Sequence, residues 1–480
     1  MLEEPISAGF RQDLTIDFYE RIIAMNKEYI IFTVLLVLWA LCSPVFAGWE
    51  PLAELKAPDP CETALFGFSV STDGGFVAIS APWKDSYQGA VYVYEVNDLE
   101  LDYVTTLLPP DLNDTDWFGY SVSIDANRIV VGTYYADEVY VYDYNGTEWS
   151  SDPEILSVAG SRNIFGFSVS IDANTIVVGA EGLGVSEPGA AYVFDYNGVE
   201  WNYKEELTDP DNRIGNLFGS SVSIDANVIV VGARWDNVSD YREGSLCVFR
   251  RNGETWAFEQ KIEGENRLDN MGYSVAVSGN TFVAGVYSYA YGANGNAGAA
   301  FVYEWNGSSW TKEATLYDPN ADTSDRFGNS VAIDGNSIVV GEMYYGASNI
   351  GAAFLFERSG SSWSQGQKFE DPSGIASDYF GNSVAIDGEI AIAGAYKDDG
   401  GKTDSGAAFI FLLLIADLNQ DGIVNLEDFA ILAKQWLDVP GNPSADIAPL
   451  SGSDNFVNML DLKVLAEQWL RIGSPYIPSP

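Results

Sequence analysis

The sequence FGFSVSIDANTIVVGA at residues 165–180, followed by GAAYVF at residues 189–194, is the clearest copy of a repeated unit. The pattern recurs about every 50 residues, and a regular period of that length indicates a repeat architecture. Each copy opens with Phe-Gly, except the fifth, which opens with Met-Gly. The seven copies begin at Phe66, Phe118, Phe165, Phe218, Met271, Phe327 and Phe380.

Each copy contains the parts of four short antiparallel strands. Residues 168–171 alternate small or polar with apolar side chains, which is typical of a strand with two different faces. Asp172-Ala173-Asn174 predicts a tight turn, and residues 176–180, apolar on both faces, predict a buried strand. GAAYVF and a segment that opens with Trp201 supply two more strands. Four strands in each of seven repeats predict a mainly β protein, a seven-bladed β-propeller.

The outer, tryptophan-led strand is missing after the seventh copy. Residues 406–411 (GAAFIF) lead directly into unrelated sequence, whereas residues 49–55 (WEPLAEL) precede the first copy. We therefore predict that this N-terminal strand completes the last blade and removes the free sheet edges that invite aggregation.

Composition restricts the chemistry. The chain has 24 basic and 69 acidic residues, and a formal net charge of −45 argues against nucleic acid or anionic membranes as partners. It contains no histidine, the commonest general base and metal ligand. Cys61 and Cys247 fall in different repeats, so we predict two free thiols rather than a disulfide.

The N-terminal region has the layout of a secretory signal. Residues 25–47 combine a short charged start, an apolar run and a small residue, Ala47, before Gly48. We predict a signal peptide over 25–47, with residues 1–24 a mis-called extension, and a secreted or cell-surface protein with no membrane span after cleavage. A retained membrane anchor is the alternative.

The repeats over residues 48–415 resemble the FG-GAP family, the propeller repeats of integrin α-chain heads and many secreted bacterial proteins. Calcium-binding members place an Asp-rich loop between two strands of a blade, but the corresponding link here is three residues long. Three residues cannot supply six to eight oxygen ligands, so the resemblance does not imply calcium in the propeller. We interpret the recurrent aspartates as turn-formers: Asp125, Asp172, Asp225, Asp334 and Asp387.

Tyrosines gather in the variable loops of the repeats. They could stack on sugar rings, fill a protein contact, or simply pack between blades. The residues are Tyr134, Tyr135, Tyr287, Tyr289, Tyr291, Tyr344 and Tyr345.

The C-terminal region contains a duplicated calcium-loop pattern. Residues 417–428 place oxygen ligands at the spacing of an EF-hand loop, with Gly422 at the sharp turn and a helix predicted over 426–437. The pattern repeats 33 residues later, after an irregular start. Ligands predicted for the first loop are Asp417, Asn419, Asp421, Ile423 (by its carbonyl), Asn425 and Asp428. Those of the second are Asp446, Asp454, Phe456, Asn458 and Asp461.

Residues 416–472 resemble a type I dockerin, and we predict that residues 473–480 are a tail after this domain. The resemblance implies a small α-helical domain that holds one or two calcium ions and binds a cohesin-like scaffold or another extracellular protein. Dockerins commonly carry Ser or Thr pairs at the positions that select the cohesin; here these positions are Leu426-Glu427 and Met459-Leu460.

Two functions remain open. In the first, a secreted, non-catalytic protein binds a glycan or protein ligand with its propeller and is tethered by its dockerin to an extracellular assembly. In the second, the propeller is a polysaccharide-degrading glycosidase or lyase. Uniform repeats and the absence of histidine favour the first, and the sequence singles out no catalytic or cofactor-binding residue.

Overall fold

The computed structural model describes residues 49–413 and the pairs 45–46 and 423–424, apart from gaps at 98–99, 111–115, 161–163, 183–186, 238–240, 291–294, 347, 372–373 and 400–401. The chain divides into two compact units, Pro51–Leu412 and a second made of Met1–Glu50 with Leu413–Pro480. In the second unit, β1 (Val45–Phe46) pairs antiparallel with β30 (Ile423–Val424). No helix of the described residues is long and apolar enough to span a membrane.

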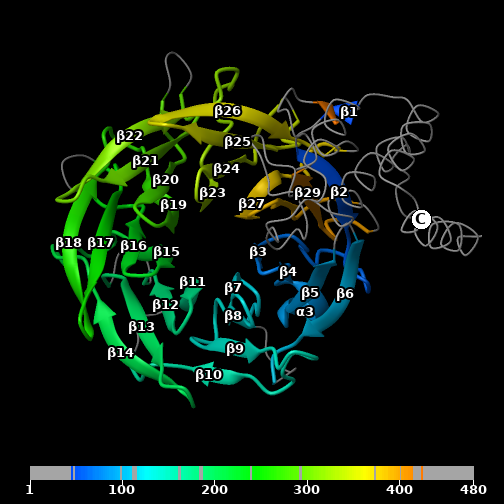
Figure 1. The fold of residues 1–480 in the computed structure, drawn as a ribbon, viewed down its shortest axis with the longest axis horizontal. Helices are drawn as coiled ribbons and strands as arrows, with labels where there is room; N and C mark the ends of the chain where they lie inside the picture. The colour runs from blue at the N-terminus through cyan, green and yellow to red at the C-terminus, as the bar shows by residue number, and fades with distance from the viewer. Residues whose placement is uncertain are drawn as a thin grey trace, which may run out of the picture. The chain divides into compact units, whose positions relative to one another are not determined.

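The main unit is a ring of seven four-stranded antiparallel sheets (Figure 1). Blade 1 is β3 (Val70–Asp73), β4 (Phe76–Ala81), β5 (Ala90–Asn97) and β6 (Glu100–Leu107). Blade 2 is β7 (Ser121–Asp125), β8 (Arg128–Gly132), β9 (Val139–Asp143) and β10 (Glu154–Leu156). Blade 3 is β11 (Phe165–Asp172), β12 (Thr175–Ala180), β13 (Ala190–Tyr196) and β14 (Trp201–Leu207). Blades 4 and 5 are β15 (Phe218–Asp225), β16 (Val228–Ala233), β17 (Ser245–Asn252), β18 (Thr255–Glu263); and β19 (Met271–Ser278), β20 (Thr281–Val286), β21 (Ala299–Trp305), β22 (Trp310–Leu316). Blade 6 is β23 (Ser330–Asp334), β24 (Ser337–Glu342), β25 (Ala352–Ser359) and β26 (Ser362–Phe369). Between β4 and β5 lies a short turn, α3 (Lys84–Tyr87).

Blade 7 is built from both ends of the repeat array. Its strand order is β2 (Trp49–Leu55), β29 (Ala407–Leu413), β28 (Ile390–Ala395) and β27 (Phe380–Asp387), which confirms the predicted closure by the N-terminal strand. The seven-bladed propeller is confirmed with it. The free thiols of Cys61 and Cys247 are confirmed as well.

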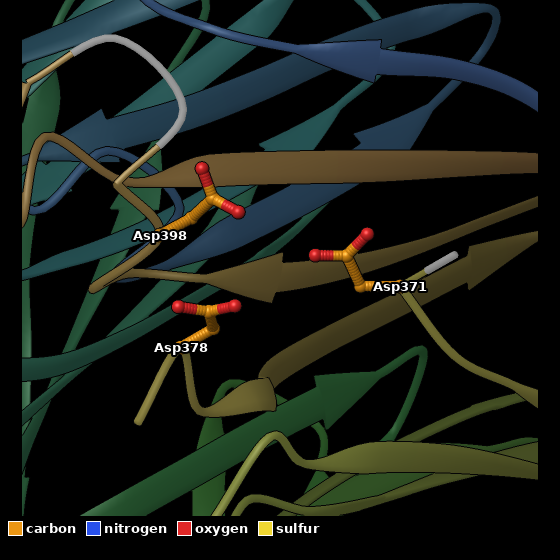
Figure 2. Close-up of side chains that lie close together, drawn as sticks. All are labelled: Asp371, Asp378 and Asp398. Atoms are coloured by element: carbon orange, nitrogen blue, oxygen red, sulfur yellow. The ribbon is translucent and has the colours of Figure 1, made fainter. Parts of the chain in front are cut away.

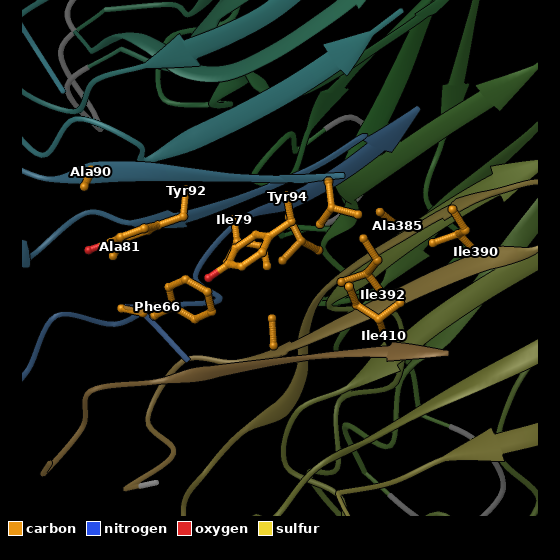
Figure 3. Packing of buried hydrophobic residues seen from close by; sticks show 14 of the residues in the cluster. Phe66, Ile79, Ala81, Ala90, Tyr92, Tyr94, Ala385, Ile390, Ile392 and Ile410 are labelled. Atoms are coloured by element: carbon orange, nitrogen blue, oxygen red, sulfur yellow. The ribbon is translucent and has the colours of Figure 1, made fainter. Parts of the chain in front are cut away.

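Apolar cores lie between neighbouring blades. Where the ring closes, Phe66, Ile79 and Tyr92 of blade 1 pack with Ile392 and Ile410 of blade 7 (Figure 3). The second strand of each blade is buried almost throughout, as its two-sided apolar sequence predicts. Each blade therefore depends on both neighbours for the burial of its sheet faces.

The repeat motif also supplies a recurrent polar bond across six of the seven blade junctions. The Ser121 hydroxyl of blade 2 donates to the Gly166 carbonyl of the FG step in blade 3 at 2.9 Å. The same bond recurs at 2.8–3.0 Å from Ser168 to Gly219, Ser221 to Gly272, Ser274 to Gly328, Ser330 to Gly381 and, across the closure, Ser383 to Gly67. The repeat therefore requires a serine at the donor position and a glycine at the FG step, because the backbones of neighbouring blades approach closely here.

At the other end of the innermost strands, the five predicted turn aspartates form a closed ring together with Asp73 and Ser278. Each carboxylate accepts a hydrogen bond from a backbone N–H in the turn of the next blade, and a serine takes this place once. The pairs are Asp73 with Ala126, Asp125 with Ala173, Asp172 with Ala226, Asp225 with Gly279, Ser278 with Gly335, Asp334 with Gly388 and Asp387 with Gly74. The aspartates therefore form turns, as predicted, and also link the blades.

This ring concentrates negative charge. Burial first, and then the charges of Asp73, Asp334 and Glu389, raise the pKa of Asp387 to about 6, against a partly compensating hydrogen bond from Gly74. The folded protein therefore binds this proton more tightly than the unfolded chain does. By linkage, the contribution of Asp387 to the free energy of unfolding falls as pH rises from about 4 to above 6.

We expect the Asp387→Asn variant to gain melting temperature over wild type at pH 8 and to lose that gain at pH 4. The Ser278→Asp variant, which adds a seventh carboxylate to the ring, is expected to have a lower melting temperature than wild type at pH 8. Thermal melts between pH 4 and 8 measure both effects. A difference between Asp387→Asn and wild type that does not vary with pH would contradict this account.

Candidate functional site

The opposite end of the propeller axis, where the FG steps lie, carries a closed ring of side chains from all seven blades, which we call the aromatic collar. Most members follow an FG or MG glycine or lie just after a second strand, so the repeat places them side by side. The collar consists of Phe68, Tyr120, Phe167, Arg234, Tyr273, Tyr287, Arg326, Tyr344, Tyr379 and Tyr396. Centroid distances between successive rings lie between 4.3 Å (Tyr273–Tyr287) and 5.9 Å (Phe68–Tyr396).

Two arginines bridge gaps between the aromatic rings. Arg234 lies over both Phe167 and Tyr273, at 5.2 and 5.4 Å from the ring centroids. Arg326 lies between Tyr287 and Tyr344, at 4.8 and 4.7 Å, and donates to the Tyr287 hydroxyl. Such cation–π contacts hold guanidinium groups in place while leaving donors for a ligand.

A buried carboxylate lies against the collar. Glu181 Oε2 is 2.6 Å from Arg234 Nη2. Burial raises the pKa of Glu181 to about 7, because the effect of desolvation exceeds the opposing effect of Arg234. This carboxyl group can therefore gain or lose a proton near neutral pH.

Next to the collar, blades 1 and 2 present a second aromatic group, the Trp117 platform, formed by Trp83, Tyr87, Trp117, Tyr134 and Tyr135. Trp117 stacks on Tyr87 at 5.9 Å and on Tyr134 at 5.2 Å, and contacts Trp83 and Tyr135 edge-on. Tyr87 and Tyr135 are 43% and 61% exposed. The platform therefore offers flat apolar faces to solvent.

Backbone strain accompanies these side chains. The residue before the FG or MG step has a left-handed backbone in all seven repeats, with φ between 53° and 65°: Leu65, Trp117, Ile164, Leu217, Asn270, Arg326 and Tyr379. Bulky residues rarely adopt this conformation, which costs on the order of 1–3 kcal/mol at each site. At Trp117, a hydrogen bond from its N–H to the Tyr87 carbonyl of the preceding blade, at 3.0 Å, helps to hold it.

A pocket of about 310 Å³ lies beside the collar at blade 6. Arg326 and Tyr344 of the collar line it, together with Asp322, Thr323, Ser324, Asp325, Gly346 and Asn349. Its polar lining and its position at the collar make it a candidate for ligand contacts.

The loop tyrosines noted in the sequence divide between the site and the blade packing. Tyr134 and Tyr135 belong to the Trp117 platform, and Tyr287 and Tyr344 to the collar. Tyr289 and Tyr345 instead pack against the third strands, on Phe301 and Phe354. Tyr291 lies outside the described residues.

Trp117 and the residues that follow the FG or MG glycines, such as Tyr120, Phe167 and Tyr273, were not predicted from the sequence. The available signal was the position directly after the glycine, which is aromatic in four of the seven repeats: Phe68, Tyr120, Phe167 and Tyr273. The predicted calcium ligands over residues 417–461 lie outside the described residues, except Ile423 in β30. The predicted signal peptide lies outside them too, apart from the pair 45–46.

The fold and the collar define a seven-bladed β-propeller whose blades meet through FG steps around the axis. The FG-GAP repeat matches residues 49–94, 102–146, 156–194, 201–249, 310–356 and 363–411, more than half of the chain. The protein belongs to the FG-GAP repeat family. The matched ranges leave out residues 250–309, which contain most of the repeat that opens with Met271.

A curated relative is similar to part of the chain. A sialidase from Clostridium perfringens is 29% identical over 140 residues, which cover 26% of this chain and 33% of the sialidase. The chain thus spans about a third of the length of that relative.

Proposed function

We propose that the propeller is a non-catalytic glycan-binding domain that holds sugar rings against the Trp117 platform and the adjoining collar. The observation that carries this proposal is the cluster of five touching aromatic rings, two of them well exposed, at one end of the propeller axis. Indole and phenol faces bury the apolar faces of sugars while their polar edges accept and donate hydrogen bonds. The likeness to a stretch of a sialidase supports a glycan as the ligand.

The collar adds polar groups at the edge of this surface. Arg234, Arg326 and Glu181 provide donors and an acceptor within the same end of the propeller. A ligand site commonly combines flat apolar area with a few fixed polar groups that set its orientation. We further propose that the protein is secreted and that its C-terminal, dockerin-like region holds calcium and tethers the propeller to an extracellular assembly.

We expect Trp117→Ala to weaken glycan binding by about 30-fold, the effect of losing about 2 kcal/mol at a central aromatic contact. A glycan array with the full chain identifies the ligand, and calorimetry on that glycan measures the dissociation constant. Phe258→Ala is the control, because Phe258 is an exposed aromatic side chain, like Tyr87 and Tyr135 of the platform, but lies on the outer strand β18. Failure of the wild type to bind any glycan, or equal affinity of Trp117→Ala and wild type, would refute the proposal.

One observation favours glycoside hydrolysis as a second candidate. Glu181, with a pKa of about 7 beside Arg234, has the protonation behaviour of a general acid. Release of free sugar by the full chain, lost in Glu181→Gln with binding retained, would replace binding by catalysis as the main function.

A further inference from the structure

A buried polar pocket recurs at the junction before the FG step of several blades. In blade 4 its walls are Asp209 of an Asp-Pro turn, Asn216 two residues before Phe218, and Asp236 four residues after Gly232. The side chains of Asp209, Asn216 and Asp236 are almost completely buried. This pocket holds a cation supplied by the chain itself.

That cation is the ammonium group of Lys261, which lies five residues after Trp256 on the outer strand. Lys261 Nζ is 2.8 Å from one carboxylate oxygen each of Asp209, Asp211 and Asp236. In blade 1 another ammonium enters the corresponding pocket from a different position: Lys84 Nζ is 2.9 Å from Asp59. In both blades a lysine ammonium thus pairs with the aspartate of the Asp-Pro turn, which is buried in blade 4 (Asp209) and exposed in blade 1 (Asp59).

Blade 7 has three carboxylates at the same positions. Asp371 belongs to an Asp-Pro turn, Asp378 lies two residues before Phe380, and Asp398 lies four residues after Gly394. Figure 2 shows the three side chains converging from separate segments, and each offers an oxygen within 4.8 Å of the others. The residue five after Trp49, the counterpart of Lys261, is Glu54, whose carboxylate pairs with Lys56 instead.

Blade 6 carries a similar set. Asp318 and Asp325 occupy the first two positions, and Glu342, the last residue of β24, provides the third carboxylate. Glu342 is 0% exposed. Within the described part of the chain, neither carboxylate oxygen of Glu342 has a hydrogen-bond partner. The same holds for Oδ2 of the buried Asp318. Lys368, the counterpart of Lys261, instead contacts Glu370 at 2.5 Å and the Tyr345 hydroxyl at 3.1 Å.

The pKa of Glu342 is consistent with buried carboxylates that Lys368 compensates only in part. Burial first, and then the charges of Asp318 and Asp325, raise the pKa of Glu342 to about 9, and Lys368 offsets only part of this. A buried carboxylate without partners is strongly disfavoured unless a cation compensates it. Asp325 also lines the pocket of about 310 Å³ beside the collar, so one residue of this set borders an open pocket.

We propose that the pockets of blades 6 and 7 each bind a divalent cation of the calcium type, in the place that the Lys261 ammonium takes in blade 4. Carboxylate oxygens are hard ligands that suit calcium, and two ligands at about 2.4 Å from one ion lie at most about 4.8 Å apart. The carboxylates of blade 7 already meet that limit. These two sites are separate from the calcium loops predicted near the C-terminus and do not depend on the proposed glycan binding.

The test counts calcium ions in the full chain. Asp421→Ala and Asp454→Ala are introduced together as a background, so that the predicted C-terminal loops do not contribute. Equilibrium dialysis against Ca²⁺ followed by metal analysis is expected to give two ions per chain, and a chelator is expected to lower the melting temperature. In this background, Glu342→Gln and Asp378→Asn are each expected to remove one ion and about half of the calcium-dependent rise in melting temperature.

Glu342→Gln keeps the size and shape of the side chain, so it is expected to fold in chelator. Two lysine exchanges test the equivalence of the pockets. Glu54→Lys should place an ammonium in the blade 7 pocket, which removes one ion and raises the melting temperature in chelator. Lys261→Ala should empty the blade 4 pocket and add one ion. If the background binds no calcium, or if Glu342→Gln, Asp378→Asn and Glu54→Lys all retain two ions, the pockets are not cation sites.

Discussion

Deletion of residues 49–55 is expected to destabilise the propeller by several kcal/mol and to cause aggregation. These residues are strand β2, the outer strand of blade 7, and its loss leaves β29 as an open edge. Leu52 and Leu55 of β2 also pack against the core that closes the ring. Burial of two such side chains contributes about 1.5–3 kcal/mol each when complete, and an unpaired edge of apolar strands invites intermolecular pairing. Thermal melts and light scattering measure the two effects.

The matched control moves the strand instead of removing it. Residues 49–55 are inserted after Leu413 through a short flexible linker, so that the outer strand follows the third one as β14 follows β13 in blade 3. We expect this permuted chain to recover most of the melting temperature and to remain monomeric. A deletion variant as stable and monomeric as wild type would show that β2 does not close the ring.

The blades were predictable because the FG step, the turn and the apolar second strand repeat at fixed spacing. Each of these signals reflects a local requirement, such as the left-handed backbone of Ala173 in the turn after Asp172. The closure followed from counting strands, since Trp49 begins an outer strand that has no repeat of its own. Local sequence signals and the count of strands therefore predict most of the fold.

The candidate sites were less predictable because they combine different residue types from neighbouring blades. The collar uses Phe68 and Tyr120 at one offset from the glycine, but Arg326 at another, so no single column of the repeat shows it. The cation pockets are similar: blade 7 uses Asp398, whereas blade 6 uses Glu342, three positions earlier in the repeat. Only the folded ring shows that these side chains reach the same places.

The closing seam should also be intolerant of a single methyl group at Gly394. A Cβ atom at this position would lie 2.0 Å from the Gly67 carbonyl oxygen and 2.5 Å from Ser383 Oγ. Those two atoms are the partners of the hydrogen bond that joins blade 7 to blade 1, at 2.8 Å. Relief of the clash must therefore separate the blades or break the bond, and both responses expose the core around Phe66.

We expect Gly394→Ala to lower the free energy of unfolding by about 3 kcal/mol, the upper part of the usual range for overpacking, plus the loss of one hydrogen bond. Gly341→Ala in blade 6, where the Cβ would lie 2.0 Å from the Gly381 oxygen, should behave alike. Gly295→Ala is the control, because its Cβ would meet nothing within 4 Å and should change stability by less than about 0.5 kcal/mol. Denaturant unfolding of the three variants decides the matter. Equal stability of Gly394→Ala and Gly295→Ala would mean that the blades are not held together by close approach of their backbones at the FG glycines.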